Sequence, residues 1–322
     1  MKPAVLMTDP RHFQIKGGAN PHTRLPDNSL KVVDLEHAWP QWHNYVDALL
    51  EAGVDVYVID ALPELTGMVF AANAGFLKGR LDAVPSAQKV FYPSHFMVAH
   101  RAGEALVFSA FMASFGFALR DYDPSRRFEG EADAFPVGRN EALRWIFTHG
   151  FRSDAQIGDW LQDEVLGQTP LALRLTNPSY YHGDTLLCDL GGPFMAWLGG
   201  LDADSRERLS AALGQRLVAL DDEDADGFVA NSFYVETERA RLLFAPATIR
   251  PSTIRRIEAL GIEVVAVDIS EFFGKGGGGP KCMVFNLGMI DVAESDLTEA
   301  QREFRRSRHI STLRREGRFP GL

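Results

Sequence analysis

The stretch ALLEAGVDVYVIDALP, residues 48–63, ends a helical pattern at a glycine and passes directly into a β-branched run. Glycine is preferred just after a helix because it adopts positive φ without strain, and short runs rich in valine and isoleucine are typical of strands. The stretch IEALGIEVVAVDIS, residues 257–270, repeats this order of helix, glycine and strand. Two such units, in a chain where short apolar runs alternate with helical spacing, predict an α/β fold.

Further elements are expected on both sides of these two units. Short apolar runs that end in a turn or a polar residue are strand candidates: AVLMTDP, VDVYVIDALP, GMVFAANAGF, KVFYPS, ALVFSAF, TLLCDLGG, GFVANSFYVE, RLLFAPA, IEVVAVDIS and CMVFNLGMI. Helical spacing occurs over residues 39–52, 154–166, 204–217, 252–261 and 297–315. The nearly uncharged stretch 105–119 is shorter than the ~20 residues of a membrane helix, so we expect it to form a buried strand and helix.

The composition bounds the class of protein. The 322 residues are 46% hydrophobic and 24% charged, which is typical of a globular chain, and no linker divides them, so one domain over residues 1–322 is expected. A net charge of −10 argues against a nucleic-acid partner. No membrane partner is expected either, and a homo-oligomer is compatible with the composition. The acidic run DDEDADG, residues 221–227, is expected to be an exposed loop.

The cysteine content indicates a reducing compartment. Cys188 and Cys282 are the only two cysteines, so the chain has no disulfide framework and no cysteine spacing typical of structural zinc. The amino-terminal sequence MKPAVLMTDPRHF has no signal-peptide pattern. A cytoplasmic location is therefore expected.

The segment GKGGGGPKCMV, residues 274–284, is the first candidate for chemistry. A thiolate that attacks an electrophile needs the substrate at roughly 3–3.5 Å, and glycines remove side chains that would obstruct that approach. The same pattern predicts a loop, followed by a strand that begins near Met283. Two interpretations stay open at this point: Cys282 is a nucleophile, or it is a buried thiol behind a flexible loop.

Three other polar residues stand in apolar or turn-forming surroundings. These are Glu129 in RFEGEADAF, and His182 and Asp184 in NPSYYHGDTLLCDL. If a strand begins here, residues two positions apart lie on one face of it, so His182 and Asp184 would share one wall of a pocket. A lone histidine is more often structural, and only its neighbours favour a functional role.

Four segments in this order resemble the guanidino-modifying enzyme superfamily, the penteins. They are MVFAANAGF (68–76), FEGEAD (128–133), YYHGDTLL (180–187) and GGGGPKCMV (276–284). The superfamily includes arginine deiminase, arginine dihydrolase, dimethylarginine dimethylaminohydrolase and the amidinotransferases. The resemblance implies a five-bladed α/β propeller of ββαβ units around a pseudo-five-fold axis, with the active site at its centre.

The resemblance also implies roles for residues of this chain. Cys282 would be the nucleophile and His182 the general acid and base. Glu129 and Asp184 would be the carboxylates that hold the guanidinium group, because carboxylates accept its N–H groups in paired hydrogen bonds. Asn73 occupies the position where many relatives place an aspartate. The resemblance implies no metal and no organic cofactor.

Two arginines resemble residues that grip the substrate carboxylate in the dimethylarginine-hydrolysing relatives. Arg101 lies in HRAGE and Arg152 in HGFRSD. For Arg101 a plain surface position is the alternative. Cys188, within TLLCDL, is expected to be a core residue.

The chain departs from the family pattern at three places. Thr66 and Gly67 stand where many relatives have Pro-Asp, so the aspartate that can bind an α-amino group is missing. Asn73 replaces an aspartate, as it does in arginine dihydrolase-like relatives. FEGEAD is one residue longer than the Glu-Gly-Gly-Asp form, so Glu131 is an alternative to Glu129 as the functional carboxylate.

These observations lead to one main hypothesis and two alternatives. The main hypothesis is a hydrolase that cleaves a C–N bond of arginine or an arginine derivative through a covalent thiouronium adduct on Cys282, with the dihydrolase subtype favoured by Asn73. The first alternative is an amidinotransferase, in which an amine replaces water. The second is a protein that binds guanidino ligands without turnover.

Overall fold

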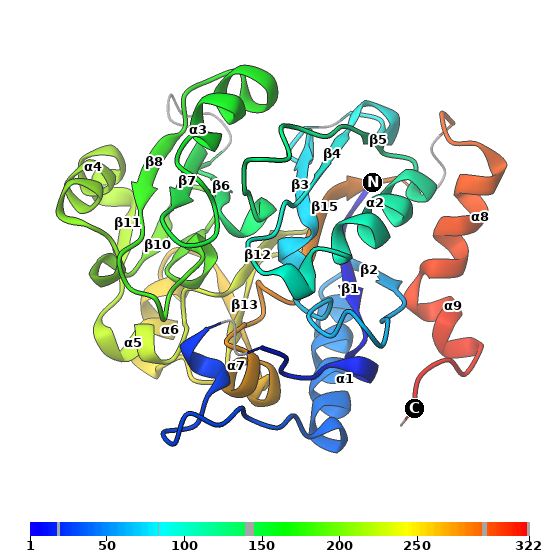
Figure 1. Ribbon diagram of the computed structural model, residues 1–322, viewed down its shortest axis with the longest axis horizontal. Helices are drawn as coiled ribbons and strands as arrows, with labels where there is room; N and C mark the ends of the chain where they lie inside the picture. Colours follow the sequence, from blue (N-terminus) through cyan, green and yellow to red (C-terminus); the bar gives the residue numbers. More distant parts are fainter. Residues whose placement is uncertain (18–19, 83, 139–144, 292–294, 321–322) are drawn as a thin grey trace.

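Five three-stranded sheets surround one axis in the computed structural model, which describes residues 1–17, 20–82, 84–138, 145–291 and 295–320. Figure 1 shows the helices that connect the strands lying around the outside of these sheets. The α/β propeller expected from the sequence is therefore confirmed.

Each sheet has the same ββαβ order: an antiparallel strand pair, a helical connection, and a third strand parallel to the second. The second sheet contains β3 (Gly75–Lys78), β4 (Val90–Pro93), α2 (Glu104–Phe115) and β5 (Ala118–Leu119). The third contains β6 (Ala134–Pro136), β7 (Trp145–His149), α3 (Ile157–Trp160), a π-helical turn (Leu161–Leu166) and β8 (Leu171–Arg174). The fourth contains β9 (Leu187–Asp189), β10 (Phe194–Ala196), α4 (Ala203–Leu213) and β11 (Leu217–Ala219), and the fifth contains β12 (Phe233–Glu236), β13 (Arg241–Pro246), α6 (Pro251–Glu258) and β14 (Glu263–Val267).

The first sheet joins the two ends of the chain. It contains β1 (Lys2–Thr8), α1 (Leu35–Glu51), β2 (Asp55–Ile59) and, from the far end of the sequence, β15 (Phe285–Ile290). β1 pairs in parallel with β2 and antiparallel with β15, with a register shift between Ala4 and Val5. Because β15 supplies the strand that would otherwise be missing, the propeller closes into a ring.

Local signals explain where α1 and α6 begin and where the chain turns into the strand that follows each of them. The Asp34 carboxylate accepts a hydrogen bond from the Glu36 N–H and so caps α1, and Pro251 stands at the first position of α6. Gly53 (φ +85°) follows α1 and Gly261 (φ +73°) follows α6, each in the left-handed conformation that turns the chain toward the next strand. The helix, glycine and strand order expected at both places is confirmed.

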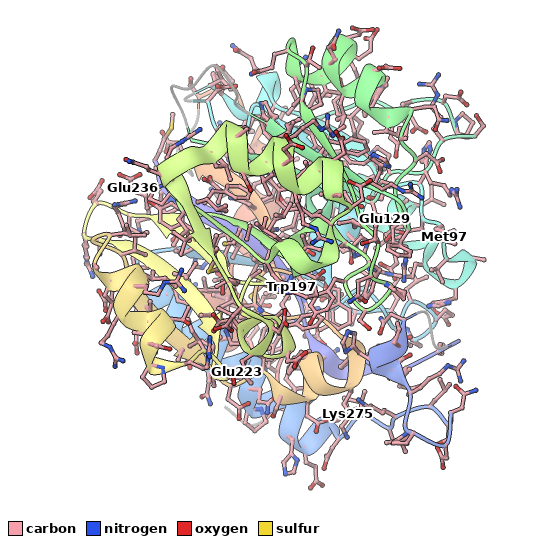
Figure 2. The ribbon with its side chains drawn as sticks, turned by 90° about the vertical axis from the view of Figure 1, so that its left-hand side faces the viewer. Met97, Glu129, Trp197, Glu223, Glu236 and Lys275 are labelled. Atoms are coloured by element: carbon pink, nitrogen blue, oxygen red, sulfur yellow. The ribbon has the colours of Figure 1, made fainter. Side chains whose placement is uncertain are left out.

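The remaining helices lie between or outside the sheets: α5 (Asp222–Asp226), α7 (Ser270–Gly276), α8 (Glu299–Arg308) and α9 (Ile310–Arg315). Figure 2 shows the molecule from the side, with α4 in front and Glu223 and Lys275 labelled toward the lower edge. Among the described residues, no helix combines the length and the apolar character that crossing a bilayer would require.

Some of the expected elements were wrong. ALVFSAF is part of the helix α2. The buried residues of that helix follow helical spacing: Phe108, Phe111, Met112 and Phe115. The acidic run at 221–227 is the short helix α5, and its Asp224 is buried beside Arg250 instead of exposed.

Other boundaries and several strands also differ from the expectation. In GMVFAANAGF only the end forms a strand, from Gly75, and β15 begins at Phe285, two residues later than expected. The strands β5, β6, β7, β8, β10 and β11 have no counterpart among the candidates; most of them have only two to four residues, too few for a periodic signal.

Candidate functional site

The turns that precede the first strand of each sheet meet around the propeller axis. These first strands are the inner ones, since β9 contacts both β6 and β12. Three of the turns are 3-10 helices: Ala71–Ala74 before β3, Gly130–Ala132 before β6 and Gly183–Thr185 before β9. Asn231 and Cys282 lie in the corresponding places before β12 and β15.

Neighbouring turns touch directly. The Ala72 N–H donates to the Cys282 carbonyl at 3.1 Å. A Cβ on Gly130 would lie 2.1 Å from the Gly75 carbonyl oxygen, so only glycine allows this close approach. Residues far apart in the sequence therefore converge here because five equivalent turns face one axis.

Cys282 lies in this cluster with its thiol buried. Its side chain donates to Asp184 Oδ2 at 3.4 Å, and Asn231 Nδ2 donates to Cys282 Sγ at 3.2 Å. Burial raises the pKa of Cys282 well above its usual value, and the adjacent Asp184 charge raises it further. Without a bound cation, the resting group is the neutral thiol.

Asn231 connects Asp184 to the glycine loop that carries Cys282, and the sequence analysis missed it. Its Nδ2 also donates to the Asp184 carbonyl at 2.8 Å, and its Oδ1 accepts from the backbone N–H groups of Gly279, at 2.6 Å, and Cys282, at 3.3 Å. Asn231 therefore holds the glycine loop and the nucleophile candidate in one geometry. A polar residue that interrupts the apolar run GFVANSFYVE directly before a strand was the signal available for it.

Asp184 is fully buried, and its two carboxylate oxygens differ in their contacts. Oδ2 accepts from the Cys282 thiol, while Oδ1 has no hydrogen-bond partner among the described residues. Burial raises the pKa of Asp184 to about 6, against the opposing effect of the His182 and Lys281 charges. A buried carboxylate with an unused acceptor is suited to bind a cation.

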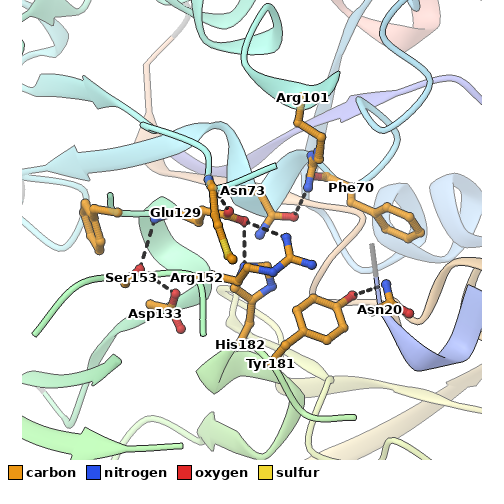
Figure 3. A network of polar contacts seen from close by, with 12 residues as sticks. Asn20, Phe70, Asn73, Arg101, Glu129, Asp133, Arg152, Ser153, Tyr181 and His182 are labelled. Atoms are coloured by element: carbon orange, nitrogen blue, oxygen red, sulfur yellow. Dashed lines mark hydrogen bonds and ion pairs between the residues drawn. The ribbon is translucent and has the colours of Figure 1, made fainter. Parts of the chain in front are cut away.

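His182 is paired with Glu129. The distance from His182 Nε2 to Glu129 Oε2 is 2.8 Å, and Glu129 Oε1 accepts from the Met97 N–H at 3.1 Å (Figure 3). Arg152 Nη1 lies 3.6 Å from Glu129 Oε2. Burial acts to raise the pKa of Glu129, but the hydrogen bond and charge of His182, followed by the charges of Arg152 and Arg101, lower it to about 2.

Asp133 and Ser153 hold this pair in place. The Glu129 N–H donates to Ser153 Oγ at 3.1 Å, and Ser153 Oγ donates to Asp133 Oδ2 at 2.7 Å (Figure 3). Asp133 Oδ1 accepts from the Gly183 N–H at 2.9 Å, directly after His182. One carboxylate thus fixes the backbones that carry both members of the pair.

His182 and Asp184 do not enter a strand with alternating faces as expected; they belong to a 3-10 turn, and β9 begins only at Leu187.

Glu131, the alternative to Glu129, faces elsewhere. It forms ion pairs with Arg80 and with Lys281 Nζ, the latter at 2.6 Å, and accepts from the Asn286 N–H at 2.9 Å. Gly130 (φ +69°) lies between the two glutamates and turns the backbone so that they point in different directions.

A small cavity of about 60 Å³ opens onto Cys282. Among the residues of interest, Cys282, Asn73, Arg101 and Arg152 line it. Asp184, Glu129 and His182 do not line it, but Asp184 contacts Cys282, and Glu129 contacts both Arg152 and His182. Asn73 Oδ1 accepts from Arg101 Nη1 at 2.8 Å, and Asn73 Nδ2 has no partner among the described residues (Figure 3).

The structure thus brings the candidate residues into one region of the molecule. Cys188 is not among them: it is buried in the core, and its thiol donates to the Ser232 carbonyl at 3.3 Å. No group of three or more metal-ligating side chains occurs in the part of the chain that the structure describes.

The chain has five ββαβ sheets around one axis, and the turns before the inner strands carry a thiol, a histidine–glutamate pair and a second carboxylate. These features define a pentein-fold protein with a cysteine-centred site. The sequence is 28% identical over 288 residues to N(G),N(G)-dimethylarginine dimethylaminohydrolase of Mycobacterium tuberculosis, a match that covers 87% of this chain and 84% of that protein. Over most of its length the chain is therefore similar to a guanidino-modifying enzyme.

Other relatives and solved structures agree with this placement. The bifunctional arginine dihydrolase/ornithine cyclodeaminase ArgZ of Synechocystis is 25% identical over 290 residues, which span 88% of this chain and 37% of ArgZ. The crystal structure of the substrate-bound N-terminal domain of ArgZ has a TM-score of 0.78 at 23% identity, covering 89% of this chain and 98% of that domain. A dimethylarginine dimethylaminohydrolase adduct has a TM-score of 0.65 at 17% identity, covering 89% of this chain and 100% of that one. At these identities the structural matches establish the fold. No protein-family model matches the chain.

Proposed function

We propose that this protein is a cysteine-dependent hydrolase that cleaves a C–N bond of a guanidino substrate. One observation carries the proposal: the Cys282 thiol lies 3.4 Å from a buried carboxylate, Asp184, whose other oxygen has no partner among the described residues. A guanidinium group that donates to this free oxygen would place its central carbon beside the sulfur.

The resting thiol and the bound cation act together in this mechanism. Burial keeps Cys282 protonated in the resting protein. A guanidinium group bound beside it lowers the cysteine pKa, so the thiol releases its proton to solvent as the substrate binds and becomes the thiolate. The thiolate then forms a C–S bond to the guanidinium carbon. The carbon becomes tetrahedral while Asp184 neutralises the positive charge.

His182 and Glu129 would move the protons. His182 donates a proton to the departing amine as its C–N bond breaks, which leaves a thiouronium adduct on Cys282. It then takes a proton from a water molecule that attacks the adduct, and the C–S bond breaks to release a ureido product and the thiolate. Glu129 orients the His182 ring and stabilises its charged form through the 2.8 Å contact.

Three cavity residues complete the proposed binding site. Asn73, Arg101 and Arg152 line the approach to Cys282, where the part of the substrate beyond the guanidinium group would lie. The names of the relatives support hydrolysis: one is a dimethylaminohydrolase and another contains an arginine dihydrolase. A variant of the ArgZ domain has also been captured covalently bonded to a reaction intermediate.

The proposed enzyme acts as one domain in a reducing compartment. Residues 1–322 would act as a single catalytic domain, since the ring closes only when β15 joins β1. Cys188 and Cys282 are both free thiols, which suits a reducing, cytoplasmic compartment. A homo-oligomer is compatible with this arrangement.

The test is a product assay combined with a mass spectrum of the protein. The purified chain is incubated with a panel of guanidino compounds, and ureido products, ammonia and released amines are measured. Protein quenched during turnover should carry an adduct on Cys282, and Cys282→Ser should form neither product nor adduct. Turnover that appears only when an acceptor amine is added would indicate amidinotransfer instead, and no product from any compound would refute the proposal.

A further inference from the structure

Cationic side chains line the cavity that opens onto Cys282. Lys16, Arg101 and Arg152 line it together with the imidazole of His100, and none of the described lining residues is an aspartate or a glutamate. The pKa of His100 is lowered, first by burial and then by the charges of Arg101, Arg152 and Lys16, which favours its neutral form. The carboxylates of the site, Glu129 and Asp184, do not line the cavity.

The wall that could bind a second cation is already occupied by Arg101. Its Nη2 donates to the Gly67 carbonyl at 3.1 Å, to the Phe70 carbonyl at 3.3 Å and to Glu104 Oε2 at 2.7 Å, and its Nε donates to Glu104 Oε1 at 2.9 Å. Arg101 Nη1 donates to Asn73. The acceptors that would suit an ammonium group are thus taken by a resident guanidinium.

Gly67 adds a steric reason. A Cβ at this position would lie 2.8 Å from Arg101 Nε and 2.8 Å from Glu104 Oε1, so the wall has no room for an acidic side chain at Gly67 while Arg101 holds this position. The lining can therefore offer positive charge to a ligand, while the carboxylates that pair with its arginines, Glu104 with Arg101 and Glu129 with Arg152, are fully buried.

We propose that the substrate is a guanidino carboxylate with no ammonium group next to its carboxylate, so that its tail is purely anionic. This inference rests on the proposed function, because it places the guanidinium group at Asp184. The carboxylate then lies among the lining residues Lys16, His100 and Arg152. An α-ammonium group would be brought into the same positive field, which disfavours it. Asn20 Oδ1 lines the cavity without a partner among the described residues, but it is a neutral amide oxygen and brings no negative charge to offset that field.

Four guanidino compounds separate the two charges. Arginine has both the carboxylate and the ammonium group, agmatine has only the ammonium group, 5-guanidinopentanoate has only the carboxylate, and butylguanidine has neither. We expect kcat/KM to be at least about tenfold higher for 5-guanidinopentanoate than for each of the other three, the factor that about 1.4 kcal/mol of discrimination produces. Arginine or agmatine equal to or better than 5-guanidinopentanoate would overturn the inference and leave the hydrolase proposal standing.

A binding measurement keeps the inference independent of turnover. Calorimetry with Cys282→Ser should show the same order of affinities for the four compounds. If no compound is turned over by the native chain, the proposed function fails, and the affinities still decide the inference: a preference for 5-guanidinopentanoate supports it, and equal or absent binding refutes it.

Lys16→Gln tests the source of the preference without disturbing buried groups, because Lys16 is exposed. It should lower kcat/KM for 5-guanidinopentanoate roughly three- to tenfold, with a weaker effect at high salt, and leave butylguanidine unchanged. The matched control Lys2→Gln removes an exposed charge that does not line the cavity and should leave both values unchanged. An equal effect of the two variants would contradict the assignment of Lys16.

Discussion

The two cavities along the propeller axis differ in the chemistry of their walls. One, of about 60 Å³, lies at the turns before the inner strands and is lined by Cys282. The other, of about 370 Å³, lies along the inner strands themselves and is lined by Cys188. Both contain a buried thiol and charged groups, but among the described residues the thiol of the smaller one lies beside a carboxylate, Asp184, whose second oxygen has no partner. In this molecule the chemistry of the wall, and not the volume, marks the candidate active site.

The glutamates on either side of Gly130 divide between these two regions. Glu129 is paired with His182 next to the lining of the small cavity, whereas Glu131 lines the large one and is neutralised by Arg80 and Lys281. A carboxylate held by two cations is a structural group. One that contacts a histidine can take part in proton transfer.

The largest expected difference is between the two cysteines. Cys282→Ser should lower kcat/KM at least about a thousandfold, because the hydroxyl is not ionised by the same environment. Cys188→Ser should change it by less than about threefold, since a hydroxyl can keep the hydrogen bond to the Ser232 carbonyl. Steady-state kinetics of both variants measure this, and a comparable loss in Cys188→Ser would show that the large cavity also takes part in the reaction.

The pH dependence should reflect Asp184. Because the pKa of Asp184 is raised to about 6, its protonated form increases below that pH and cannot bind a guanidinium group, so kcat/KM should fall as pH drops below about 6. Asp184→Asn should lower kcat/KM roughly a hundredfold or more and remove this acidic limb. A pH–rate profile in which the limb survives in Asp184→Asn would assign it to another group.

The pKa shifts of Asp184 and Glu129 predict opposite dependences of stability on pH. The pKa of Asp184 rises from 3.8 in the unfolded chain to about 6 in the fold, so ionisation of this carboxyl destabilises the fold as pH rises through that range. Asp184→Asn should therefore be more stable than the native chain at pH 7. It should lose this advantage toward pH 4. Glu129, with its pKa lowered to about 2, contributes stability above its unfolded value of 4.5 that is lost as pH falls toward 2. Thermal unfolding at several pH values tests both signs.

Replacing the two glutamates should separate the residue that acts in proton transfer from the one that only stabilises the fold. Glu129→Gln should lower kcat roughly a hundredfold, because it removes the charge that stabilises protonated His182. It should also lower the melting temperature at pH 7, because the ionised Glu129 carboxylate, whose pKa is lowered to about 2, contributes stability at that pH. Glu131→Gln should keep activity within about threefold and lower the free energy of unfolding by up to about 3–5 kcal/mol, because it leaves Arg80 and Lys281 without their buried partner. The reverse pattern would exchange the roles of the two residues.

The smallest expected effect is at Asn231. Asn231→Ala should lower kcat/KM about tenfold, because a thiolate at Cys282 loses one hydrogen bond, and about 1.5 kcal/mol, the lower end of the range for a bond to a charged group, corresponds to about that factor. The rate of Cys282 alkylation by iodoacetamide at pH 7 should fall as well. If activity drops while the alkylation rate does not, Asn231 acts through the glycine loop instead of through the sulfur.

The sequence anticipated the long, regular elements and missed the short ones. α1 and α6, with their following glycines, were predicted close to their observed positions, although the cap of α1 at Asp34 was not. α2 was predicted partly as a strand because its apolar residues run almost without interruption and obscure the helical spacing of its buried face. Asn231 was missed because its one local signal, a polar residue that interrupts an apolar run before a strand, does not indicate a role, which arises from contacts with Cys282 and Asp184 far away in the chain.

By itself, the sequence determined the α/β class, the elements around the two helix–glycine–strand units and the residue types available for guanidino chemistry. These features depend on local backbone preferences and side-chain chemistry, which a short segment already contains. Only the tertiary structure decided which carboxylate meets the histidine and which thiol meets a carboxylate. Those contacts depend on how five turns approach one axis, and on the positive φ of Gly130, which sends Glu129 to one cavity and Glu131 to the other.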